Sequence, residues 1–75
     1  MQIFAAVYAI DDEGAARSFG LGVRLESANN RAEDIAAITR ALKMPSTAVV
    51  TVDAGDAYTL DWPGCDIQAR IQPVP

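Results

Sequence analysis

A helical pattern occurs only once in this 75-residue chain, over about residues 31–44, and the segments on both sides of it alternate like β-strands. The apolar positions of this segment recur at three- and four-residue steps: Ala32, Ile35, Ile38 or Thr39, and Leu42. Asn30 followed by Glu33 matches a helix N-cap, and we expect Pro45 to end the helix. A single helix among several strands constrains the fold more than any other feature of the sequence.

The segment before the helix predicts a hairpin. Residues 2–10 are apolar on both alternating faces, which is typical of a strand that is buried on both sides or has one face free for a partner. Asp11–Gly14 supplies turn residues, and alternation resumes from Arg17 to Glu26 with one clear apolar face.

Two glycines interrupt the other face of the second strand. Gly20 and Gly22 leave that face bare, so an aromatic ring from the neighbouring strand can lie over the backbone there. Phe4 and Tyr8 are the rings that we expect to fill this role.

The segment after the helix predicts a second hairpin and a short last strand. Residues 47–53 are rich in β-branched side chains, and alternation resumes after Ala54–Asp56 in residues 58–62. Pro63–Gly64 breaks this pattern, and residues 66–72 alternate once more. The order is therefore ββαβββ, which predicts one α+β domain over residues 1–75: an antiparallel sheet of four to five strands with the helix on one face.

One local resemblance accompanies this hairpin. The segment Val50–Cys65, with its Pro63-Gly64-Cys65 turn, resembles the opening hairpin of HicB-type antitoxins. In that family a helix follows the hairpin, whereas the only predicted helix here precedes it. The resemblance therefore implies a hairpin and carries no function to this chain.

Composition limits the partners and the compartment. Ten acidic against six basic residues give a net charge of −4, which disfavours direct binding to nucleic acid or anionic lipid. Cys65 is the only cysteine, so no internal disulfide can form and a reducing compartment is compatible with the chain. Residues 1–5 lack the basic region of a secretory signal, and no apolar run is long enough for a membrane span. We expect a cytoplasmic protein that does not enter membranes.

The sequence contains no recognisable catalytic, cofactor or metal site. Histidine is absent, and Cys65 follows a turn without an imidazole partner. The densest acidic group has the spacing of no calcium loop: Asp53, Asp56, Asp61 and Asp66. We therefore expect a protein that is not an enzyme and that needs no cofactor.

An apolar surplus is the strongest functional signal. We expect the helix to cover the sheet face that carries the larger aliphatic set: Ile3, Val7, Phe19, Leu21, Val23 and Leu25. Phe4, Tyr8 and Ile10 then point to the other face, which nothing in the chain remains to cover. Tyr58 and Trp62 add two aromatic rings whose facing the pattern leaves open between core and interface.

These features favour a small protein-binding module, such as a bacterial or phage inhibitor or adaptor that occupies a partner's surface. The candidate contact residues are the aromatic, apolar and glycine positions named above: Phe4, Tyr8, Ile10, Gly20, Gly22, Tyr58 and Trp62. The alternative is a structural homo-oligomer, for example a homodimer, that pairs through the same exposed sheet face.

Overall fold

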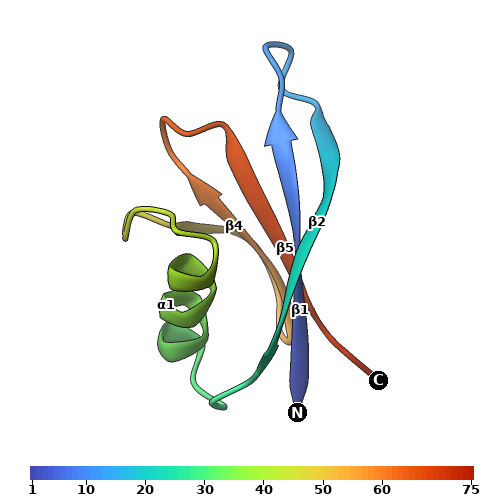
Figure 1. Cartoon of the computed structure of the whole chain (residues 1–75), viewed down its shortest axis with the longest axis vertical. Helices are drawn as coiled ribbons and strands as arrows, with labels where there is room; N and C mark the ends of the chain where they lie inside the picture. Colours follow the sequence, from blue (N-terminus) through green and yellow to red (C-terminus); the bar gives the residue numbers. More distant parts are fainter.

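The computed structural model describes residues 1–75 as one five-stranded antiparallel sheet with one helix packed on one of its faces (Figure 1). The elements in chain order are β1 (Gln2–Ile10), β2 (Ala16–Glu26), α1 (Arg31–Ala41), β3 (Val49–Ala54), β4 (Ala57–Trp62) and β5 (Ile67–Pro73). The predicted class and the order ββαβββ are confirmed. Across the sheet the strands follow the order β2-β1-β5-β4-β3, so β2 and β3 form its two edges.

Short turns close the two hairpins that the sequence predicts, β1–β2 and β3–β4. The Asp11 carboxylate accepts hydrogen bonds from the backbone N–H groups of Glu13 and Ala15, at 2.9 Å each, which closes the β1–β2 turn. Two residues, Gly55 and Asp56, join β3 to β4. Both turns lie where the sequence predicts them.

Helix α1 begins as predicted and ends earlier than predicted. The Asn30 side chain accepts a hydrogen bond from the Glu33 N–H at 3.1 Å, so Asn30 is the N-cap. The helix ends at Ala41, and the expectation that it reaches Met44 and is stopped by Pro45 is wrong. Lys43 adopts a left-handed φ of 56°, and the N–H groups of residues 43 and 44 bond back to the carbonyls of residues 40 and 39. This Schellman arrangement closes the helix before the proline. Helix α1 has neither the length nor the apolar character needed to cross a membrane.

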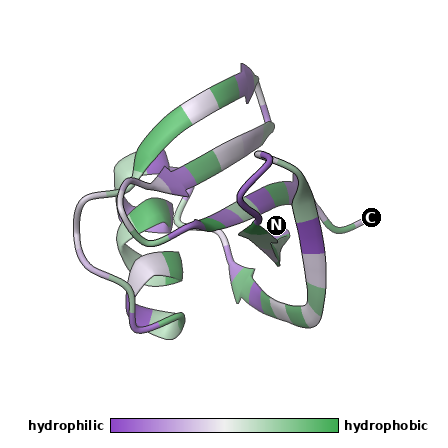
Figure 2. Cartoon of the chain, turned by 90° about the horizontal axis from the view of Figure 1, so that it is seen from above, coloured by the Kyte–Doolittle hydropathy of each residue, from purple (hydrophilic) through white to green (hydrophobic).

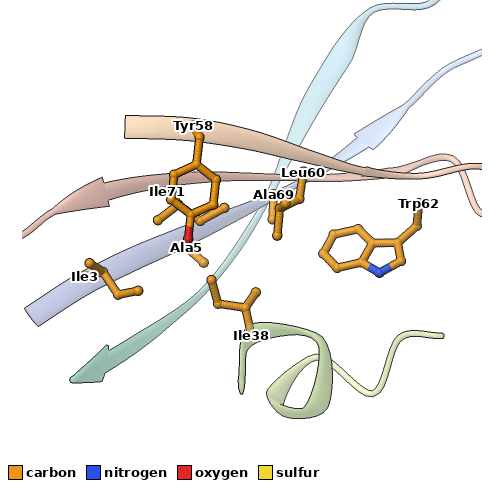
Figure 3. Close-up of a cluster of buried hydrophobic side chains, with 8 residues drawn as sticks. All are labelled: Ile3, Ala5, Ile38, Tyr58, Leu60, Trp62, Ala69 and Ile71. Carbon is orange, nitrogen blue, oxygen red and sulfur yellow. The ribbon is translucent and has the colours of Figure 1, made fainter. Parts of the chain in front are cut away.

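The core lies between α1 and the middle of the sheet. Figure 3 shows the side chains of its main cluster: Ile3, Ala5, Ile38, Tyr58, Leu60, Trp62, Ala69 and Ile71. Tyr58 and Trp62 are 7% and 1% exposed, and the Trp62 indole N–H donates to the Pro45 carbonyl at 3.0 Å. The sequence pattern leaves open whether these two rings face the core or an interface, and the structure places them in the core. Both rings pack in the core, because the even-numbered side chains of β4 point toward the helix.

The prediction for β2 is wrong for two of its apolar residues. Phe19 and Leu21 are 55% and 54% exposed instead of lying under the helix. In the β1–β2 register, Gly22 lies opposite Ala6 and Ser18 opposite Tyr8, so residues 19–21 form an irregularity in the ladder. The turn end of this hairpin also rises past α1 (Figure 1), where the helix cannot cover it. Nearer the helix, Leu25 packs against the core as expected.

Candidate functional site

The open face is the sheet face opposite α1, and no helix or other strand packs on it (Figure 1). It carries the side chains that alternate with the core residues: Phe4, Ala6, Tyr8, Gly22, Arg24, Val52, Thr59, Asp61, Gln68, Arg70 and Gln72. A shallow groove of about 390 Å³ runs along it from β1 across β5 and β4 to β3. Concave surfaces with apolar walls and a few polar groups are typical of binding sites.

The Phe4 ring lies over a bare glycine. A Cβ atom placed on Gly22 would stand 2.2 Å from the ring carbon Cζ of Phe4, much closer than any van der Waals contact. The ring therefore packs closely against the β2 backbone from the adjacent strand, as the glycine pattern predicts. This contact leaves Phe4 half-buried and fixes where its ring lies on the open face.

Gly20 has a different role from the one expected. Its φ is +70°, and a Cβ atom there would meet nothing within 4 Å, so no ring covers it. Glycine is favoured at this position because the β2 irregularity requires a left-handed backbone. Gly20 therefore shapes the edge of the sheet and does not form part of the ring contact.

Arg70 is held in place by its neighbours on the open face. Its guanidinium carbon stands 4.1 Å from the centre of the Tyr8 ring, and its Nε donates to the side-chain oxygen of Gln68 at 3.0 Å. Gln68 in turn donates to Asp61 at 3.3 Å, and the Thr51 hydroxyl donates to the same carboxylate at 2.6 Å. These contacts form a row from β3 to β1. The Gln68 side chain holds the guanidinium through Nε, and the Tyr8 ring supports one of its flat faces.

The terminal nitrogens of Arg70 remain free. Neither Arg70 nor Arg24 forms a salt bridge, since the three ion pairs of the protein use Met1, Arg17 and Arg31 as their cations. Asp61 is the carboxylate nearest in register to Arg70 on this face, and its oxygens already accept bonds from Thr51 and Gln68. The open face thus carries two unpaired arginines in a protein whose net charge is −4.

The structure brings together some of the predicted residues and separates others. Phe4 and Tyr8 share the open face, with Gly22 under the first ring. Ile10 lies at the end of β1 beyond the groove, where its N–H donates to the Asp66 carbonyl at 2.8 Å. Trp62 is buried and lies outside the groove, whereas Tyr58 is buried in the core and is also among the residues that line the groove.

Arg70 is a functional candidate that the sequence patterns do not single out. Its signal is present in the alternation of residues 66–72, where Gln68, Arg70 and Gln72 share one face. Which strand this face adjoins depends on β5 pairing with β1, and no local pattern encodes that pairing. The stack on Tyr8 follows from this pairing alone.

The site can bind a partner through van der Waals contacts, hydrogen bonds and one ion pair. It presents a ring edge, small apolar side chains, amides and a guanidinium fork that suits a carboxylate. Cys65 is exposed in the β4–β5 turn, away from the groove. No group of three or more potential metal ligands gathers anywhere in the protein.

Beyond the open face, one ion pair ties the helix to the β3–β4 hairpin. Arg31 donates to both oxygens of Asp53 at 2.7 and 3.0 Å and to the Gly55 carbonyl at 2.6 Å, and its guanidinium lies 4.5 Å from the Tyr58 ring centre. The Arg31 hydrogen bonds lower the pKa of Asp53 to about 2. The carboxylate is therefore ionised and paired over the physiological range.

Comparison of the chain with models of protein families, with curated proteins and with solved structures finds no match, so the site must be interpreted from its own geometry.

Proposed function

We propose that this chain is a non-catalytic protein-binding module whose open face occupies a surface of a partner protein. The observation that carries the proposal is the fixed guanidinium of Arg70, stacked on Tyr8 and bonded through Nε to Gln68, with its two terminal nitrogens free. A guanidinium that is already oriented loses little conformational entropy when its two terminal nitrogens donate to the two oxygens of a carboxylate.

The groove beside Arg70 supports the same function. Phe4 and Tyr8 present half-buried rings on either side of Ala6, so an apolar side chain can pack between them. Interface hot spots favour aromatic and arginine residues at a concave centre, and this face combines both. The partner surface that fits is an apolar side chain next to an aspartate or glutamate. A small inhibitor or adaptor of bacterial or phage origin would act in this way by blocking the surface it covers.

The net charge supports a protein partner over a nucleic acid. Two arginines on one face stand against an overall charge of −4, which opposes approach to a continuous row of phosphates. A single carboxylate on a folded protein meets only the local positive charge of Arg70 and Arg24. This mode of binding requires no catalytic group.

The experiment begins with capture of binding proteins from the organism that encodes the chain, followed by purification and titration of each captured protein. Arg70→Ala should weaken binding by about tenfold or more because it removes the ion pair. Tyr8→Ala should weaken it by a similar factor because it removes a ring of the groove and the stack that orients Arg70. Arg40→Ala is the matched control for charge, since Arg40 is exposed on α1 and contacts nothing on the open face. Phe19→Ala is the control for loss of an exposed ring.

If Arg70→Ala and Tyr8→Ala bind like the wild type while Arg40→Ala or Phe19→Ala loses affinity, the open face is not the binding surface. The alternative function, a homo-oligomer that pairs through the open face, predicts instead that the isolated chain self-associates and that Tyr8→Ala makes it monomeric. Light scattering after size exclusion, applied to the wild-type chain and to Tyr8→Ala, identifies this alternative, because only pairing through the open face is lost in Tyr8→Ala.

A further inference from the structure

The edge strand β3 is exposed along its whole length. All six of its residues are exposed, and Val49, Val50 and Val52 are 47%, 38% and 58% exposed. Its only strand neighbour is β4. None of the backbone hydrogen bonds outside the helix and strand ladders involves a residue of β3, so its outward N–H and C=O groups have no backbone partner. In Figure 2, β3 is the strand at the top of the view, and it is mainly green, the hydrophobic colour, up to its hydrophilic arrowhead.

The two edges of the sheet differ in how they are protected. On β2, the left-handed Gly20 distorts the edge, and Arg17, Arg24 and Glu26 add charges along it. Distortion and charge are the usual ways in which proteins prevent edge strands from pairing. Strand β3 contains no lysine, arginine, proline or positive-φ residue, and only a register shift near Thr51 interrupts its ladder. The β3 edge is therefore open to another strand, and the β2 edge is not.

The chemistry of β3 fits a second copy of itself. Its one charged side chain, Asp53, is already paired with Arg31 through two hydrogen bonds, so two β3 strands can approach without an unpaired like charge on either. β-branched side chains pack well against one another across antiparallel strands. The core is also small, with 11 of 75 residues buried, and chains of this size often gain stability by association.

We propose that two copies of this chain associate by pairing their β3 strands antiparallel, which joins two five-stranded sheets into one continuous sheet. The twofold axis of such a pair is perpendicular to the sheet, because antiparallel neighbours are related by a half-turn about the sheet normal. Both α1 helices then lie on one side and both open faces lie side by side on the other. The inference concerns a different surface from the open face and does not depend on the proposed function.

The test measures the mass of the full chain by light scattering and sedimentation, from low micromolar to near-millimolar concentration. Val50→Lys places a charge on the β3 edge on the helix side, outside the groove, and should weaken the dimer by about tenfold or more through cross-strand repulsion and lost packing. Leu21→Lys makes the same change at an exposed apolar residue of the opposite edge and should leave the dimer unchanged. Tyr8→Ala should also leave it unchanged.

Amide hydrogen exchange of the wild-type protein provides a readout that needs no variant to fold. Exchange in β3 should slow as concentration rises, and exchange in β2 should not change. A chain that remains monomeric throughout this range overturns the inference. So does a dimer that survives Val50→Lys, or one that Leu21→Lys or Tyr8→Ala dissociates, since either result places the contact elsewhere.

Discussion

Replacing Gly22 with alanine tests the contact that positions Phe4 on the open face. The new Cβ atom would lie 2.2 Å from Cζ of the ring, and 2.7 Å and 3.0 Å from Cε1 and Cε2. Carbon atoms in contact prefer about 3.5–4.0 Å, so the ring would have to withdraw by roughly 1.5 Å or rotate away. Overpacking of this kind costs about 1–3 kcal/mol, and we expect Gly22→Ala to lower the free energy of unfolding by about that amount.

A Phe4→Ala background provides the control for this prediction. Without the ring, the three atoms nearest to a Cβ at position 22 are gone, and the φ of Gly22 is not in the left-handed region. Gly22→Ala should then be neutral or stabilise by about 0.5–1 kcal/mol, because alanine restricts the unfolded chain more than glycine. The two substitutions should therefore couple by about 2 kcal/mol.

Urea unfolding measures this coupling directly. Trp62 is the only tryptophan and is buried, so its fluorescence reports loss of the core. If Gly22→Ala costs the same in both backgrounds, or costs nothing when Phe4 is present, the ring does not pack on the glycine as described.

Three further predictions concern the core, the ion pair and the helix cap. Tyr58→Phe should leave stability unchanged or raise it by up to about 1 kcal/mol in urea unfolding, because the buried Tyr58 hydroxyl has no hydrogen-bond partner in the protein; a loss above that amount would contradict this. The pKa of Asp53 is lowered to about 2 from 3.8, mainly by its hydrogen bonds with Arg31, so its contribution to stability is present above pH 3.8 and is lost as the pH falls through about 2. Asp53→Asn should remove that part of the acid dependence of the urea midpoint, and an unchanged acid limb would show that other groups produce it. Asn30→Ala should lower the free energy of unfolding by about 1 kcal/mol through loss of the bond to the Glu33 N–H, whereas Asn30→Asp should retain it.

Much of the fold can be predicted from local sequence patterns. The position of α1 follows from the spacing of its apolar residues and from Asn30, and both hairpins follow from their turn residues. The contact between Phe4 and Gly22 is predictable too, because neighbouring strands of a hairpin place a ring beside a bare glycine. These features depend on residues that are close in the chain.

The features that local patterns miss depend on long-range pairing. Alternation in residues 58–62 shows that Tyr58 and Trp62 share a face, but only the pairing of β4 with β5 decides that this face meets the helix. The stack of Arg70 on Tyr8 likewise depends on β5 lying beside β1. The exposure of Phe19 has another cause, since the irregularity at Gly20 and the limited length of α1 both leave it uncovered.

A map of the side chains that a bound partner contacts tests most directly whether the open face is the binding surface. The methyl groups of Ala6 and Thr59 lie on the open face. Those of Ile35, in α1, and of Met44, just after it, lie on the helix side of the sheet. If the open face binds the partner, adding a purified partner shifts the Ala6 and Thr59 methyl signals together with the Arg70 Nε–H signal, and leaves the helix-side methyl signals unchanged. Shifts confined to Ile35 and Met44 would contradict it and would place binding on the helix.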